Sequence, residues 1–541
     1  MVSPPGSSTD EPKSPYLHPS ASSLEYSLNP AETTDGDDFV SPFQGHTRND
    51  QRDMMRMGKN QEFARMYRPV AALSFSIVLG ATWEFMLLSQ HEGLNDGGVA
   101  GLFWSYVWTF IGFGFCVYSM AEMASMAPIS GGQYHWVSEF ASPKYQRFLS
   151  YITGWMSVLA WQAGAAAGPF LAGTLIQGLI ILHRPSYEPA RWQGTLLVCA
   201  MAFCIYVVNV WFARAMPMIQ NILLVLHVLG FLIVIIVLWA MAPRNSPRTV
   251  FTAFTDRGGW STIGLSLMVG QITAIYGSLT SDATAHMAEE VRDASRHVPR
   301  AMAWGYIINC IMGIILLVTY LFALPSVGAA IENPTSFPFL YVFGGALAPS
   351  GVTILAGVVL LLVFSSNITY GAAASRQTFS FARDHGLPFS EWLAAVHNTK
   401  HIPTNSILFT CIFTSLLSLI YIGSEVAFNA IISLYAGSLM FTYAFSVGSV
   451  LYQRIYHPAQ LPPASWSLGK RGGPIVNAIS LLYIIFALFW CFWPNKSFVT
   501  VDNFNWGVVM FLAVACASLV MYFVQGRKVY EGPVSTVIGR Y

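Results

Sequence analysis

Charged residues are scarce in this sequence. They make up 10% of its 541 residues, whereas hydrophobic residues make up 54%. An average soluble chain carries roughly 25% charged residues, and a soluble chain of this length usually divides into several domains. The composition therefore excludes an ordinary soluble protein and indicates a membrane protein.

Residues that support enzyme or metal chemistry are also few. The seven cysteines form no CxxC pair and no external disulfide framework, so we interpret them as small apolar packing residues. HExxH, GxSxG and Walker motifs are missing, which gives no indication of an enzyme, a metal ion or another cofactor. We also expect no nucleic-acid partner.

The start of the chain has no long apolar stretch. Residues 1–60 are rich in Ser, Pro, Asp and Thr and lack the apolar segment of a signal peptide. Such a composition buries too little apolar surface to fold alone. We therefore expect residues 1–66 to form a disordered cytosolic tail.

Long apolar runs are what the rest of the sequence contains. A run of about 20 apolar residues matches the roughly 30 Å hydrocarbon core of a bilayer, at a helical rise of about 1.5 Å per residue. Unbroken runs predict helices, because barrel strands alternate apolar and polar residues. We predict an all-α polytopic membrane protein with about twelve membrane-spanning helices. The predicted spans are residues 69–91, 99–124, 149–180, 192–213, 216–241, 263–286, 301–324, 351–374, 405–422, 426–452, 474–493 and 505–525.

Basic residues are divided unequally between the two sides of this arrangement. Of the 28 Lys and Arg residues, 22 fall in segments on the side that carries both termini and six on the other, and none falls inside a predicted span. The positive-inside rule then places both termini in the cytosol. The sequence thus predicts a helical domain over residues 67–525 and a cytosolic C-terminal tail over 526–541.

Two of the predicted spans are interrupted by polar residues. Span one contains the sequence LGATWEF at residues 79–85, and span six contains YGSLTSD at residues 276–282. Each places Gly, small hydroxyl residues and one carboxylate inside an apolar helix. If the first ten spans form two inverted repeats of five, the two interruptions are equivalent. Interrupted helices at such positions are the best sequence indication of a transporter's central site.

The two carboxylates are Glu84 and Asp282, and the predicted spans contain no Lys or Arg to pair with them. An ionised carboxylate in a bilayer is costly unless it is functional or paired. Each must be protonated, face a wet cavity, or bind a cation that comes and goes. Asp282 could instead belong to the cytosolic rim, unless the helix unwinds around Gly277 and Ser278. His227 is a further candidate for proton coupling, with a neutral packed histidine as the alternative.

Other polar residues are weaker candidates for solute binding. Trp83 offers a ring face for a cationic amine, or it fills the interior. Gln162 and Asn367 cannot face lipid cheaply, so they are expected to face the bundle. They either contact solute or tie helices together.

Several loop motifs resemble those of one known family, in the same order. They are AEMASMAPISGGQYHW at 121–136, DATAHMAEEVRDAS at 282–295 with VPR at 298–300, SRQTFSFARDHGLP at 375–388, SLGK at 467–470 and GRKVYEGP at 526–533. Over about residues 60–530, the chain is similar to the fungal amino acid/choline transporter family of the amino acid–polyamine–organocation superfamily.

This resemblance implies a five-plus-five inverted repeat with broken spans one and six and two extra helices. It also implies nitrogenous solutes such as amino acids, γ-aminobutyrate, choline or polyamines. The residues implied at the solute site are Gly80, Thr82, Trp83 and Glu84, with Gly277, Ser278 and Asp282 opposite. The lysine usual in span five of the superfamily is not evident, and His227 is the nearest candidate, so the coupling ion stays open at this point.

The sequence as a whole predicts a secondary active transporter in the plasma membrane that takes up an amine or amino acid with protons. Two alternatives remain: a nutrient sensor or receptor that binds solute without moving it, and an exporter of a cluster metabolite. A channel is disfavoured, because no ring-forming charged pore helix stands out.

Overall fold

The computed structural model describes residues 47–423, 427–501 and 503–533. Within these residues, twelve helical spans are long and apolar enough to cross a membrane. This confirms the predicted all-α polytopic class and the number of spans. In chain order, the helices that build the spans are α2 (Pro69–Gly80), α3 (Thr82–Leu88) and α4 (His91–Asn95) in span one, α5 (Gly98–Met126), α7 (Gln146–His183), α8 (Arg191–Trp211), α9 (Met216–Met241), α11 (Ile263–Gly270), α12 (Ile272–Ser278) and α13 (Ala283–His286) in span six, α14 (Ala294–Ala323), α17 (Pro349–Arg383), α19 (Thr404–Ser418) and α20 (Ile420–Gly423) in span nine, α21 (Ala427–Tyr456), α22 (Gly469–Trp490) and α23 (Gly507–Met521).

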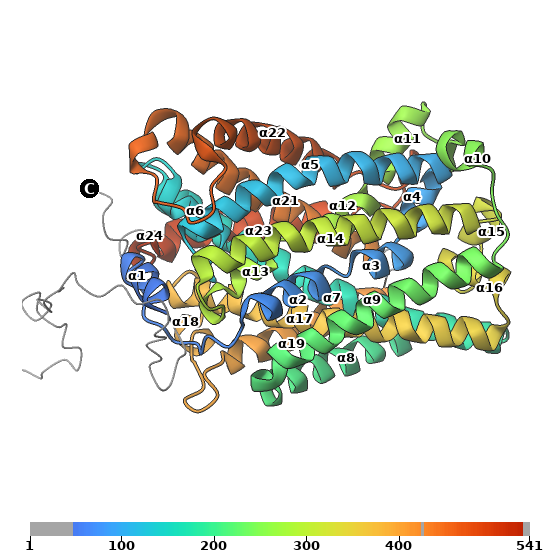
Figure 1. Ribbon diagram of the computed structural model, residues 1–541, viewed down its shortest axis with the longest axis horizontal. Helices are drawn as coiled ribbons and strands as arrows, with labels where there is room; N and C mark the ends of the chain where they lie inside the picture. Colours follow the sequence, from blue (N-terminus) through green and yellow to red (C-terminus); the bar gives the residue numbers. More distant parts are fainter. Residues whose placement is uncertain (1–46, 424–426, 502, 534–541) are drawn as a thin grey trace, which may run out of the picture. The chain divides into compact units, whose positions relative to one another are not determined.

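Short elements lie at the two ends of the helix bundle (Figure 1). One end carries α1 (Arg48–Arg56), α6 (Gln133–Phe140), α18 (Ser390–Leu393) and α24 (Arg527–Val529). We call it the basic end, because it holds the loops with most of the Lys and Arg residues. The opposite end carries α10 (Pro247–Thr252), α15 (Val327–Ile331), α16 (Pro338–Ala346) and a two-residue antiparallel pairing of β1 (Asp96–Gly97) with β2 (Thr255–Asp256).

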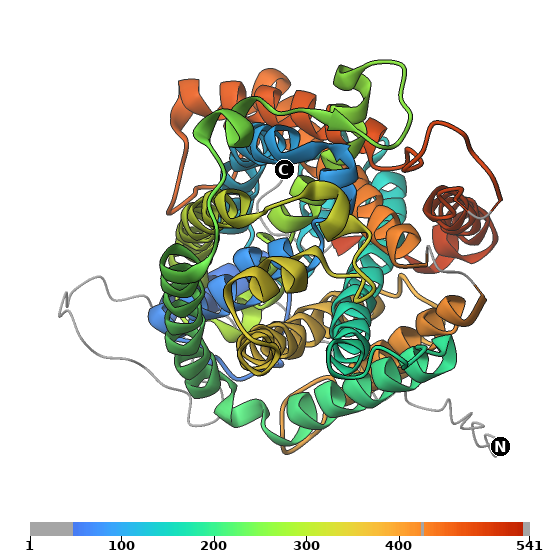
Figure 2. The same ribbon diagram turned by 90° about the vertical axis from the view of Figure 1, so that its right-hand side faces the viewer.

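The spans differ in how deeply the bundle encloses them. In spans one and ten, 83% of the most apolar stretch is buried, against 28% in span eleven and 11% in span twelve. Viewed along the bundle, α23 accordingly lies at the periphery (Figure 2). Span one, with its break, therefore lies in the protein interior, while the last two spans mainly face lipid.

Span eight is longer than its apolar run predicted. Its helix α17 continues past residue 374 to Arg383, and it therefore contains Arg376, whose side chain is 4% exposed. The predicted span of residues 351–374 therefore ends too early, and Arg376 and Arg383 lie on the part of the helix beyond it. Arg376 is tolerated in the interior because its Nε donates to Glu290 Oε1 at 2.7 Å.

The segment before span one differs from the disordered tail expected over residues 1–66. Residues 1–46 lie outside the described residues, but 47–66 are structured and include α1. The buried carboxylate of Asp50 accepts hydrogen bonds from the backbone N–H groups of Asp293 and Ala294 at 2.9 and 3.0 Å, and so caps the start of α14. Arg65 donates to the carbonyls of Ala288 and Val291. These polar residues order the segment through loop partners that composition does not reveal.

The segment after span twelve is likewise packed as far as it is described. The Tyr530 side chain is fully buried, and its hydroxyl lies 2.6 Å from Ser150 Oγ. Arg147 donates to the Tyr530 carbonyl. Residues 534–541 of the predicted C-terminal tail lie outside the described residues.

Candidate functional site: two helix breaks and the gates beside them

Span one breaks where the sequence places Gly80. Helix α2 ends at that glycine, Ala81 adopts a left-handed conformation with φ of 38°, and α3 begins at the next residue. Asn309 on α14 bridges the break: its Nδ2 donates to the Ile77 carbonyl at 3.3 Å, and its Oδ1 accepts from the Thr82 N–H at 3.4 Å. A Cβ on Gly80 would lie 2.6 Å from Asn309 Nδ2. Glycine therefore makes room for the side chain that gives the Thr82 N–H its acceptor.

Span six breaks just after Gly277 and Ser278. Helix α12 ends at Ser278, Leu279 is extended, Thr280 has φ of 89°, and α13 starts after Asp282. The sequence analysis required unwinding near these residues for Asp282 to lie inside the protein. The structure contains that unwinding, and Asp282 is 0% exposed.

Asp282 is held by side chains from three other places in the fold. Its Oδ1 accepts from the Tyr443 hydroxyl on α21 at 2.6 Å, and its Oδ2 accepts from Gln133 Nε2 on α6 at 2.6 Å. His286 Nε2 lies 3.4 Å from the same Oδ2. The other ring nitrogen of His286, Nδ1, is 2.8 Å from the Ser130 carbonyl oxygen.

Glu84 lies on the other break and is also fully buried. Its Oε1 is 2.6 Å from His227 Nδ1 on α9, while Glu84 Oε2 and His227 Nε2 have no hydrogen-bond partner. The Trp83 ring lies 5.7 Å from the His227 ring. The structure therefore brings together three of the predicted residues: Trp83, Glu84 and His227.

Both carboxylates thus have a basic neighbour, which the sequence analysis did not foresee for Asp282. The prediction from sequence named His227 as the candidate histidine and otherwise weighed only Lys and Arg as partners. His286 is 0% exposed and sits four residues after Asp282, on the same face of the short α13. The stretch 282–295 had been quoted only as a family motif, so the signal was present and unused.

A cavity of about 860 Å³ lies at the opposite end of the bundle. Its lining includes Ser89 and Asn95 from span one, Gln177 from α7 and Arg257 from the loop before span six. Tyr276 is the deepest α12 residue that lines it, one residue before Gly277. None of the nine predicted solute-binding residues lines this cavity. In the conformation described, both breaks are covered.

The cover consists of aromatic side chains in edge-to-face and tilted contact, which we call the aromatic layer. Its members are Phe85, Tyr276, Tyr435, Tyr370 and Trp161, with ring centroids 5.9, 6.2, 6.0 and 4.8 Å apart in that order. Trp161 in turn lies 4.8 Å from the His286 ring. The layer separates the cavity from Asp282.

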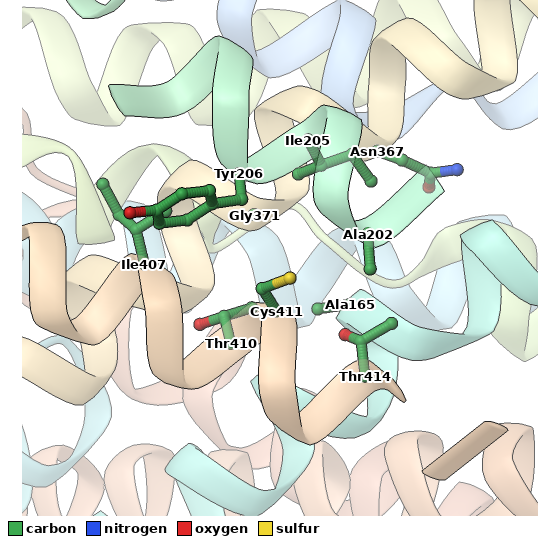
Figure 3. Close-up of a pocket in the computed structure, with 10 residues that line it drawn as sticks. All are labelled: Ala165, Ala202, Ile205, Tyr206, Asn367, Gly371, Ile407, Thr410, Cys411 and Thr414. Carbon is green, nitrogen blue, oxygen red and sulfur yellow. The ribbon is translucent and has the colours of Figure 1, made fainter. Parts of the chain in front are cut away.

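The side chains of Gln162 and Asn367 contact other helices. Gln162 Nε2 donates to Thr378 on α17 at 2.9 Å and to Thr410 on α19 at 3.0 Å. Asn367 lines a small pocket between α7, α8, α17 and α19 (Figure 3), with a cavity volume of about 10 Å³. Because that volume holds roughly one water molecule, the pocket is too small for a solute.

Ion pairs close the basic end. Arg383 donates from both terminal nitrogens to Glu289, at 2.8 and 2.9 Å. Other buried or half-buried pairs of this end include Arg376 with Glu290, Lys59 with Asp384, Arg56 with Glu139, Arg454 with Glu122, and Arg65 with Asp50. The sequence places the basic residues of these pairs in segments on the predicted cytosolic side, and the structure pairs them with buried carboxylates.

We call the ion pairs that close the basic end the seal. Two of its carboxylates, Glu289 and Asp384, have lowered pKa values. Burial raises the pKa of Glu289, but the charge and hydrogen bonds of Arg383, the Ser130 N–H and the charge of Arg65 together lower it by more, so the net shift is downward. The pKa of Asp384 is lowered in the same way, with burial opposed by Lys59 and Arg383. Both carboxylates are therefore ionised at neutral pH, and the seal does not depend on a protonation event of its own.

The chain was compared with known proteins. The amino acid permease family model matches residues 68–515. A putative amino acid/polyamine transporter from Macrophomina phaseolina is 29% identical over 80% of this chain and 95% of its own length. The choline transporter of Saccharomyces cerevisiae is 25% identical over 83% of this chain and 79% of its own. An amino-acid permease from Arabidopsis thaliana is 26% identical over 90% and 96%.

A solved structure shares the fold. The manganese transporter of Eremococcus coleocola superposes with a TM-score of 0.52 over 85% of this chain and 95% of that one, at 14% sequence identity. At that identity the likeness concerns the fold alone. Since the family model matches most of the chain, including both broken spans, this multi-pass membrane protein belongs to the amino acid permease family.

Proposed function

We propose that the protein is a proton-coupled uptake transporter of the plasma membrane, with its basic end in the cytosol. That the protein transports small nitrogenous solutes follows from its family. The coupling ion, the membrane and the direction are what we add. The orientation is supported by the positive-inside rule, because most basic residues lie at that end. The uptake direction is supported by a cavity that would then face the outside.

One observation carries this proposal: the protein is hollow at one end and sealed at the other. A transporter that works by alternating access must close one side before it opens the other. Here the 860 Å³ cavity stops at the aromatic layer, and the Arg383–Glu289 pair closes the basic end below it. We describe this as the outward-facing state of the cycle.

The solute site proposed for this cycle lies between the two breaks. An amine that leaves the cavity meets the rings of the aromatic layer, whose faces attract cations. Beyond it are Gly80, Thr82, Trp83 and Glu84 on one side and Gly277 and Ser278 on the other. The partnerless Glu84 Oε2 gives the amine an acceptor. Gln162 and Asn367 we now assign to helix packing, because their neighbours are other helices.

The function is tested with purified protein in vesicles under an imposed pH gradient. Labelled γ-aminobutyrate, choline, putrescine and neutral amino acids are compared as solutes. Accumulation above the external concentration is expected for at least one of them, and its collapse when the gradient is removed. Binding without accumulation would instead identify a receptor. Accumulation only under a reversed gradient would identify an exporter.

The Glu84 assignment has its own test. Glu84→Gln is expected to abolish uptake while surface expression stays normal, since glutamine has nearly the same shape but no charge. Uptake with unchanged affinity in this variant would remove Glu84 from the solute site.

A further inference from the structure

The contacts of His286 fix where its protons lie. A backbone carbonyl can only accept, so His286 Nδ1, 2.8 Å from the Ser130 oxygen, must carry a hydrogen. The ring orientation is well determined, because both nitrogens face an oxygen, and turning the ring over would point two carbons at those oxygens.

The second nitrogen then poses an electrostatic problem. A neutral imidazole has one N–H, so Nε2 would direct a lone pair at Asp282 Oδ2, 3.4 Å away. Two acceptors in contact repel each other in a site that excludes water. The repulsion disappears if one more proton is bound, either on Nε2 as an imidazolium or on the carboxyl group of Asp282.

No other group near the pair supplies that proton or replaces it. The Tyr443 hydroxyl and Gln133 Nε2 donate to Asp282, the Trp161 ring faces His286, and Tyr370 and Tyr435 stand beside them. Within the described residues, Asp282 forms an ion pair with His286 and with no other residue. The pair itself must therefore bind the proton.

We propose that Asp282 and His286 together form the proton-binding site of the transporter, and that one shared proton holds them in contact in the outward-facing state. This inference rests on the proton coupling proposed above and names the group responsible for it. The proton comes from water on the outer side, bonds to Nε2 or to the carboxyl oxygen, and leaves to the cytosol when the basic end opens.

The Glu84–His227 pair differs in this respect. His227 Nδ1 can donate to Glu84 Oε1 while the imidazole is neutral and the carboxylate is charged, because no second acceptor competes for that hydrogen. Its geometry is satisfied without an additional proton. The two buried acids therefore have different roles: Asp282 binds the proton, and Glu84 stays available to bind an amine.

A direct connection links the proton site to the seal. Ser130 accepts from His286 through its carbonyl and donates its N–H to Glu289 Oε1 at 3.3 Å. Glu289 is the partner of Arg383. Loss of the shared proton would make Asp282 and His286 repel each other. Movement of His286 would shift the Ser130 backbone, whose N–H contacts Glu289 of the seal. Proton release and opening of the basic end are coupled through this residue.

The test uses vesicles that contain a pH-sensitive dye and compares two variants with the wild-type protein. Asp282→Asn mimics a permanently neutral acid, and His286→Gln removes the imidazole. In the wild type, addition of solute outside is expected to acidify the interior. In both variants acidification and accumulation against a gradient should be lost, while His286→Gln keeps exchange of labelled for unlabelled solute within about threefold. His297→Gln, a change at a half-buried histidine of the basic end, should behave as the wild type.

The outcomes separate the two proposals. Acidification by both variants at the wild-type rate overturns the proton site. A wild type that exchanges solute but neither accumulates it nor acidifies the interior overturns proton coupling itself, whereas one without exchange overturns the transporter. If Asp282→Asn does not reach wild-type expression, His286→Gln and Asp282→Glu replace it. His286→Gln is expected to lose acidification and Asp282→Glu to retain it. The reverse result contradicts the site.

Discussion

Arg383 at the end of α17 holds Glu289 by two parallel hydrogen bonds of 2.8 and 2.9 Å. The carboxylate lies in the short 3₁₀ turn that follows span six, and its side chain is 0% exposed. Bidentate arginine–carboxylate contacts of this kind are among the strongest in proteins. They join the helix of span eight to the turn that follows the broken span six.

Removal of this arginine should open the basic end. Arg383→Gln leaves Glu289 buried without its partner, a loss worth about 3–5 kcal/mol, and should reduce uptake strongly. Hydrogen–deuterium exchange is expected to rise in peptides that cover residues 127–140 and 375–390. Arg296→Gln is the matched control, because the side chain of Arg296 is 57% exposed and its ion pair contributes little. Equal exchange in the two variants would contradict the seal.

Asp96 at the opposite end predicts a pH dependence of stability. Burial, followed by the nearby charge of Glu92, raises the pKa of Asp96 to about 7. In the unfolded chain the group ionises near pH 4, so between about pH 4 and pH 7 the unfolded state binds fewer protons and stability falls as pH rises. Apparent melting temperature measured from pH 5 to pH 8 should therefore fall less for Asp96→Asn than for the wild type. Parallel curves would show that Asp96 does not cause the dependence.

Tyr530 should anchor the end of the last span. Ser150 Oγ donates to the Tyr134 carbonyl at 2.8 Å, so the Tyr530 hydroxyl is the donor to Ser150. Tyr530→Phe removes one hydrogen bond, worth about 1 kcal/mol. Tyr530→Ala also removes a buried ring and should cost roughly 3–5 kcal/mol. Thermal unfolding in detergent measures both, with Tyr456→Ala, at a tyrosine that is 65% exposed, as the control.

Asn309 should be essential to the break in span one. Asn309→Ala removes the acceptor of the Thr82 N–H, whereas the Ile77 carbonyl keeps the Ala81 N–H, and a buried unsatisfied group costs about 1–3 kcal/mol. We expect a lower melting temperature together with lost transport. Asn221→Ala on α9 is the control, because Ser74, its hydrogen-bond partner, also donates to the Val70 carbonyl. A stable and active Asn309→Ala would mean that the Thr82 N–H finds another partner.

Much of the fold was predictable because a bilayer imposes simple rules. Apolar run length determines the spans, and glycine next to polar residues marks both breaks, so α2–α3 and α12–α13 could be located from sequence. Helix ends were less predictable. The run that predicted span eight stops at residue 374, but α17 continues because Arg376 finds a carboxylate from another loop.

The contacts of the site could not be predicted. Tyr443 reaches Asp282 across 161 residues of sequence, and Gln133 does so across 149. Helical periodicity gives no guide inside an unwound segment, where the direction of each side chain depends on individual backbone angles. For the same reason Gln162 and Asn367, polar and mid-span, were plausible solute contacts until their neighbours were known.

The carboxylate of Asp50 sets a limit on how the chain can be shortened or fused. Asp50 lies before the first span in sequence and caps the start of α14. Together with Thr47 it also forms the capping box of α1. An expression tag or fluorescent partner joined in place of residues before Thr47 leaves that cap intact. A truncation that starts at the first apolar residue removes it and exposes the amides of Asp293 and Ala294, so a minimal protein trimmed to its hydrophobic segments would begin too late.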